Sequence, residues 1–122
     1  MLYEDFVKTT DISNHDLQFY MDGMNEENGE ISGVLKRIRR GDYGDGTKSI
    51  SETEGVGNAL RSNTVALLDF IKEVGDEHWY QTRALQVLGL SWSDVESLNM
   101  SKLKKRKETD TLMGKGDNRE NE

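Results

Sequence analysis

Cysteine and proline are both absent from the 122 residues of this sequence. Without cysteine, disulfides, thiolate nucleophiles and cysteine-ligated zinc or iron–sulfur sites are excluded, and a reducing cytoplasm suits such a chain. Without proline, no segment is barred from forming a helix. Leucine, lysine, glutamate and arginine, which favour helices, are plentiful. We therefore expect an all-α protein of the cytoplasm.

Long apolar runs are missing as well, since no stretch approaches the roughly 18 apolar residues that a membrane span requires. We expect no membrane contact. The net charge of −7 would repel the phosphates of nucleic acid over most of the surface, so we expect no nucleic acid partner. A hydrophobic content of 34% suffices for one core. We place that helical domain at residues 1–107 and a polar tail at 108–122.

Four segments have the apolar spacing of helices. The first is Leu2–Lys8. The second begins with a capping-box pattern at residues 13–16 and ends at Gly41. The third is Leu60–Leu88, where apolar residues on more than one face predict burial on several sides. A further capping box at residues 91–94 begins the fourth.

Residues 39–57 lie between the two long predicted helices. They carry five glycines among aspartate, serine and threonine, a composition typical of a mobile surface loop that could act as a lid. The flanking helices would each be about 40 Å long, which is more than one small core can cover. We therefore expect self-association as a homodimer or homotetramer.

Carboxylates interrupt the apolar stripes of both long helices. Glu27 takes such a position on the second predicted helix, and Glu73 does so on the third. Glu30 and Asp76 each follow three residues later, on the same side of their helix. An unpartnered carboxylate there would cost several kcal/mol of desolvation or become protonated. No lysine or arginine recurs on those faces, whereas a hard divalent cation prefers oxygen ligands, so these four acids predict a Mg²⁺ or Mn²⁺ site between facing helices.

The alternative interpretation is that solvated acids, of which the chain has 23, share this spacing by chance. Their place in apolar stripes argues against it. Gly29 and Gly75 adjoin the acid pairs inside predicted helices, where glycine costs about 1 kcal/mol relative to alanine. Close approach of the two helices would explain this cost, and a local kink is the other explanation.

Three ordered motifs resemble those of the MazG-like family of all-α nucleoside triphosphate pyrophosphohydrolases. They are residues 23–31 (GMNEENGEI), residues 72–80 (KEVGDEHWY) and residues 99–106 (NMSKLKKR). The three together are specific, whereas one alone would be weak. The resemblance covers residues 17–106 and implies a helical bundle whose metal site lies between two central helices and is completed by oligomerisation.

The resemblance also implies an activity. Magnesium would bridge a nucleoside triphosphate, and water would attack the α-phosphorus to release a nucleoside monophosphate and pyrophosphate. The four acids would then be both metal ligands and catalytic residues. Five further side chains would contact the substrate: Asn99, Lys102, Arg106, Tyr80 and Lys36. Packing or solvation is the alternative role for each of these five.

Other functions stay open at this point. A dUTP- or dCTP-preferring relative, or a phosphoribosyl-ATP pyrophosphohydrolase, would share these helices and acids. A catalytically idle interaction module that uses the basic stretch 102–107 is a third possibility, against which the presence of all four acids argues. The sequence departs from the family pattern at Glu77, His78 and Gln81. We interpret His78 as a surface or interface residue rather than a catalytic one.

Overall fold

A computed structural model describes residues 2–109 of the protein. Six helices and no strand occur in this range, which confirms the all-α prediction. The chain divides into two compact units, residues 1–84 and 85–122. The helices are α1 (Tyr3–Thr10), α2 (Leu17–Arg40), α3 (Asp45–Glu54), α4 (Val56–Ser62), α5 (Thr64–Val87) and α6 (Trp92–Glu108).

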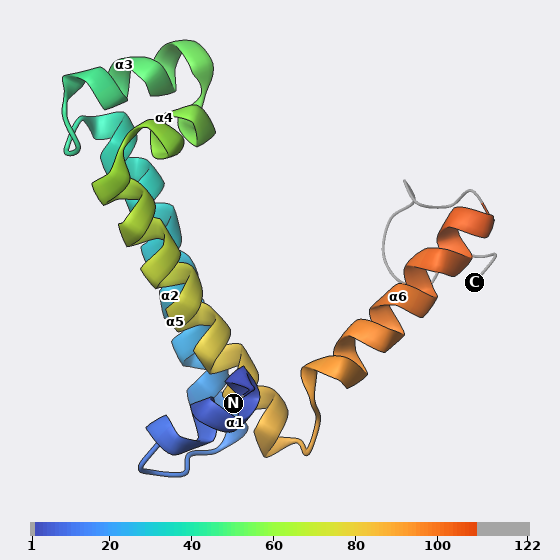
Figure 1. The fold of residues 1–122 in the computed structure, drawn as a ribbon. Helices are drawn as coiled ribbons and strands as arrows, with labels where there is room; N and C mark the ends of the chain where they lie inside the picture. The colour runs from blue at the N-terminus through green and yellow to red at the C-terminus, as the bar shows by residue number, and fades with distance from the viewer. Residues whose placement is uncertain (1, 110–122) are drawn as a thin grey trace. The chain divides into compact units, whose positions relative to one another are not determined.

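Helices α2 and α5 run antiparallel, side by side, through the first unit (Figure 1). The predicted end of α2 is confirmed, because Gly41 has φ 93° and its N–H donates to the carbonyls of Arg37 and Ile38. The predicted start is wrong by one turn. Asp16, not Ser13, caps the helix, with its carboxylate accepting from the Phe19 N–H at 3.1 Å.

The loop predicted at residues 39–57 is wrong, because most of this stretch forms α3 and the start of α4. Thr47 is buried, while Ile50 and Val56 pack against the core. The glycines that suggested a loop stand at helix ends instead, with Gly44 at φ 104° and Gly55 at φ 93°. Burial of a few apolar side chains thus outweighs a composition typical of turns.

The core of the first unit lies where α2, α4 and α5 meet. Its buried members are Val34, Ile38, Ala59, Leu60 and Ala66. Asn63 separates α4 from α5 and caps the latter through its side-chain oxygen, which accepts from the Ala66 N–H at 3.0 Å. The single helix predicted from Leu60 to Leu88 is therefore two helices with a break at Asn63.

A polar network joins the other end of the α2–α5 pair to the segment that follows α1. Arg83 of α5 pairs with Asp11 at 2.8 Å, and the Tyr20 hydroxyl of α2 donates to the same carboxylate oxygen at 2.5 Å. Nearby, the Trp79 indole donates to the Thr10 hydroxyl at 2.7 Å. The α2–α5 pair is thus fastened at both ends, by apolar packing at one and by charged and polar contacts at the other.

One face of α5 stays uncovered in the first unit. Its side chains Val65, Leu68, Ile71 and Val74 are 41% to 63% exposed. The prediction that this helix is buried on several sides is therefore wrong for residues 64–76, which are covered on one face, but it fits residues 77–84, none of which is exposed. No helix of residues 2–109 combines the length and the apolar character that crossing a membrane demands.

The described part of the second unit is mainly α6. The predicted capping box is confirmed, because the Ser91 hydroxyl accepts from the Asp94 N–H at 3.2 Å and the Asp94 carboxylate accepts from the Ser91 N–H at 2.8 Å. Most of the tail predicted at 108–122 lies outside the described residues.

Candidate metal site

A seven-residue spacing places acids in the seam between α2 and α5. On α2, Glu27 lies midway between the buried residues Tyr20 and Val34. On α5, Glu73 lies seven residues after the buried Ala66. Seven residues are close to two full turns, so each carboxylate projects from the face that packs against the other helix. The prediction that Glu27 and Glu73 lie in apolar stripes is confirmed.

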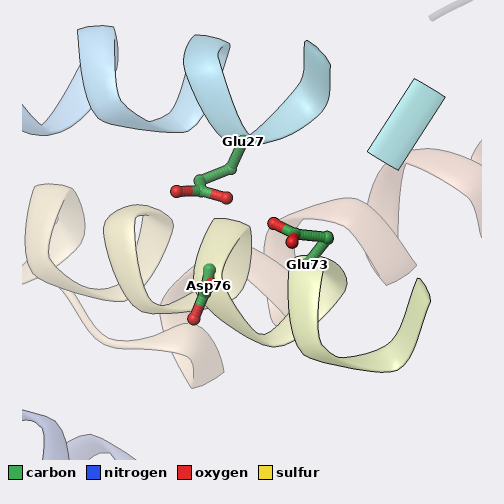
Figure 2. Close-up of side chains that lie close together, drawn as sticks. All are labelled: Glu27, Glu73 and Asp76. Carbon is green, nitrogen blue, oxygen red and sulfur yellow. The ribbon is translucent and has the colours of Figure 1, made fainter. Parts of the chain in front are cut away.

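Three carboxylates meet at this level of the seam. Glu27, Glu73 and Asp76 each offer one oxygen, and these oxygens all lie within 4.8 Å of one another. Figure 2 shows Glu27 extending from α2 toward α5, which carries the other two residues on successive turns. Oxygen donors at such spacing, supplied by two elements, suit a hard divalent cation.

The electrostatics of Glu27 are those of a carboxylate that lacks a positive partner. Its Oε2 atom is buried and has no hydrogen-bond partner. The pKa of Glu27 is raised to about 7, and burial is the largest cause. A hydrogen bond with Glu73 raises it next, followed by the negative charges of Asp76, Glu73 and Glu30. Within residues 2–109, no lysine or arginine forms an ion pair with the three acids. A bound cation would remove this repulsion and supply the missing partner for Oε2.

An open pocket of about 340 Å³ adjoins two of the three acids. Glu27, Asp76, Trp79 and Tyr80 line it. Burial is the main cause that raises the pKa of the Tyr80 hydroxyl. The nearby negative charges raise it further, and Glu27 contributes most among them. The predicted site residue Tyr80 therefore lies beside the acids, in a pocket whose walls are part carboxylate and part aromatic.

Other predicted site residues are placed less closely. Glu30 is exposed and is not one of the three acids whose oxygens meet, although its charge contributes to the raised pKa of Glu27. Lys36 is exposed on α2. His78 contacts the Tyr3 ring, with centroids 5.0 Å apart, and is partly buried. Three of the four predicted acids therefore lie together, and Glu30 is not among them.

The predicted substrate contacts on α6 belong to the second unit. Asn99 is exposed, Lys102 is half-buried and Arg106 is buried at 5% exposure. Asn99 and Lys102 line one shallow hollow along α6. A role for these residues toward the three acids stays a prediction.

Two residues of the site were not predicted as site residues from the sequence. Trp79 belongs to the motif at residues 72–80 but was given no role of its own, although its position three residues after Asp76 places it on the same side of α5. Gly23 was seen only as part of a motif, yet a Cβ there would come within 3.0 Å of three ring atoms of Tyr80. The close approach predicted at Gly29 and Gly75 is wrong, since a Cβ at either would meet no described atom within 4 Å.

Comparisons with protein-family models, with curated proteins and with solved structures found no match for this chain. The family resemblance of the three motifs therefore stays a prediction.

Proposed function

We propose that this protein is a Mg²⁺-dependent nucleoside triphosphate pyrophosphohydrolase of the MazG-like type. The observation that supports it best is the meeting of Glu27, Glu73 and Asp76 within 4.8 Å, with a buried Glu27 oxygen that lacks a hydrogen-bond partner. The acids lie beside an open pocket, where a substrate could reach them. A cytoplasmic location belongs to the same proposal.

The chemistry follows from charge. Triphosphate and carboxylates repel each other, so a cation between them is required before a substrate can approach. When bound, Mg²⁺ or Mn²⁺ would neutralise phosphate oxygens and lower the pKa of water. Glu27, Glu73 and Asp76 would hold the ion, and the exposed Glu30, one turn beyond Glu27, is the fourth ligand that the family resemblance implies.

The reaction is a displacement at the α-phosphorus. The oxygen of water forms a bond to this phosphorus, while the bond from phosphorus to the α,β-bridging oxygen breaks. Pyrophosphate leaves with the electron pair, and a carboxylate that is not fully engaged by the ion accepts the proton of water. The products are a nucleoside monophosphate and pyrophosphate.

Substrate contacts complete the proposal. Tyr80 lines the pocket and is the best supported of the five predicted contact residues. Lys36 of α2 and the α6 residues Asn99, Lys102 and Arg106 would bind phosphate or sugar oxygens. A homodimer or homotetramer would cover the apolar face of α5, where Val65, Leu68, Ile71 and Val74 are exposed.

Pyrophosphate release tests the function directly. The full chain is incubated with Mg²⁺ and a panel that contains the common ribo- and deoxyribonucleoside triphosphates, dUTP, dCTP and phosphoribosyl-ATP. Glu73→Gln should abolish release, while Glu52→Gln, a matched change on the exposed surface of α3, should preserve it. The panel separates the general enzyme from its dUTP-, dCTP- and phosphoribosyl-ATP-specific relatives. No Mg²⁺-dependent release from any substrate would reject the enzyme and leave the interaction module.

A further inference from the structure

Arg37 brings a positive charge to the edge of the three acids. It follows Glu30 by seven residues on α2, close to two full turns, so both side chains project from the same side of the helix. The Nη1 atom of Arg37 lies 4.0 Å from the position that a Cβ on Gly33 would take. Because Gly33 precedes Arg37 by one turn, the long side chain runs back along α2 in the direction of Glu30.

A chain of hydrogen bonds ties the Arg37 guanidinium to α5. Its Nη2 atom donates to the Tyr43 hydroxyl at 3.3 Å, and that hydroxyl donates to the Asp69 carboxylate of α5 at 2.7 Å. Tyr43 is itself held in place, because its carbonyl accepts from the Asn63 side chain at 3.2 Å. Asp69 lies one turn before Glu73. The guanidinium is therefore fastened at the turn of the seam that adjoins the acids.

The charge of Arg37 is not paired. Among residues 2–109, no carboxylate forms an ion pair with it, and only one of its five N–H groups donates a hydrogen bond. Hydrogen bonding to Tyr43 is the largest cause that raises the pKa of Arg37, and the charges of Asp69 and Glu30 raise it further. A guanidinium in this position, with donors to spare, would repel a cation at the acids and attract an anion that approaches them.

These two effects have opposite signs for the two parts of a cation–phosphate complex. We propose that Arg37 couples the binding of the cation to the binding of polyphosphate: it opposes a bare cation at the three acids and favours a cation that arrives with its phosphate chain. This inference rests on the proposed function, which supplies the phosphate chain. Such coupling is reciprocal, so the cation changes the affinity for polyphosphate by the same factor as polyphosphate changes that for the cation. The site would therefore fill mainly when substrate is present.

Calorimetric titrations of the full chain test the coupling without any catalysis. The ligands are manganese chloride and, separately, the equimolar complex of Mn²⁺ with a methylene-bridged triphosphate, which water cannot cleave. Arg37→Gln should bind bare Mn²⁺ about 3- to 20-fold more tightly, since it removes a unit charge within roughly 10 Å of a divalent ion. It should bind the complex about 10-fold more weakly, because charged hydrogen bonds to phosphate are lost.

Damage to the fold would weaken the binding of both ligands, so effects of opposite sign identify the charge of Arg37. Arg39→Gln makes the same charge change on the far side of α2, about 200° round the helix, and should alter neither affinity. Arg37→Lys keeps the charge and should keep the Mn²⁺ affinity of the wild type. If Arg37→Gln does not fold, Arg37→Met, which retains the apolar stem, takes its place.

Unchanged or weaker Mn²⁺ binding by Arg37→Gln, unchanged binding of the complex, or an equal effect of Arg39→Gln would overturn the coupling. The two proposals fail separately. Effects of opposite sign without pyrophosphate release would retain the coupling and reject the enzyme, while pyrophosphate release with effects of the same sign would do the reverse.

Discussion

The Arg83 Nε atom lies 2.8 Å from the Asp11 Oδ2 atom, and this ion pair joins α5 to the segment between α1 and α2. Both side chains are almost fully buried, with 10% and 8% of their surface exposed. The Tyr20 hydroxyl donates to the same oxygen, and the Arg83 guanidinium lies over the Tyr20 ring at 5.2 Å. The carboxylate is thus compensated by two donors from two different helices.

Breaking this pair should destabilise the fold strongly. Arg83→Met would leave the buried Asp11 carboxylate without its cation, and we expect the free energy of unfolding to fall by about 3 to 5 kcal/mol in chemical denaturation. The matched change Arg40→Met removes the exposed pair with Asp42 and should cost less than about 1 kcal/mol. Equal losses in the two variants would contradict the assignment of Arg83 as a buried anchor.

The pH dependence of stability should change at Glu27. Its pKa in the folded protein is raised to about 7 from 4.5, so the folded chain holds this proton more tightly than the unfolded chain. The stability that the protonated form contributes is complete below pH 4.5 and is lost as the pH rises through about 7. In metal-free buffer, we therefore expect the melting temperature of Glu27→Gln to rise relative to that of the wild type as the pH increases from about 5 to about 8. Parallel pH profiles for the two proteins would refute this.

Magnesium should stabilise the folded protein. An ion that binds only the folded state adds about 2.7 kcal/mol when its concentration is 100 times its Kd. Thermal unfolding with and without Mg²⁺ measures this gain, which Asp76→Asn should remove and Glu52→Gln should retain. If Asp76→Asn responds to Mg²⁺ as the wild type does, the ion binds elsewhere.

Self-association should depend on the apolar face of α5. Leu68 and Ile71 are 49% and 53% exposed in the single chain. Replacing both by glutamate would place charge in a buried interface, so we expect light scattering to show a monomer where the wild type is a dimer or tetramer. Thr53→Glu, on the exposed side of α3, should leave the mass unchanged. A monomeric wild type would show that this face has another use.

Two glycines on α2 should respond oppositely to alanine. Gly23→Ala collides with the Tyr80 ring, and forced repacking should cost about 1 to 3 kcal/mol of unfolding free energy. Gly29→Ala meets open space and improves helix propensity, so it should stabilise by up to about 1 kcal/mol. Denaturant titrations of the two variants make the comparison, and a loss at Gly29 would show a contact that the single chain lacks.

The sequence predicted the long helices and the acids of the seam because both depend on local periodicity. A few turns of sequence are enough to recognise the apolar stripe of α2, its end at Gly41 and the place of Glu27 in that stripe. For the same reason the capping box at Ser91 was predicted correctly.

Features that depend on distant residues were not predictable. The fit of Tyr80 against Gly23 joins positions on two helices. Gly23 lies on the buried stripe of α2, three residues after Tyr20, but that stripe does not show which side chain of another helix meets it. The pairing of Asp11 with Arg83 spans 72 residues. The helices within residues 39–57 were predicted as a loop for a related reason. They depend on burial of Thr47 and Ile50 against the rest of the unit rather than on intrinsic propensity.

The two fastened ends of the α2–α5 pair have a consequence for which ions the site would accept. Between these two ends, Glu27 of α2 meets Glu73 and Asp76 of α5 in the seam. A small ion with metal–oxygen distances of about 2.1 Å and a larger one at about 2.4 Å would then be accommodated by a slight bowing of the middle turns. Selection between Mg²⁺ and Ca²⁺ would therefore depend on the stiffness of two helices rather than on the shape of a rigid cage.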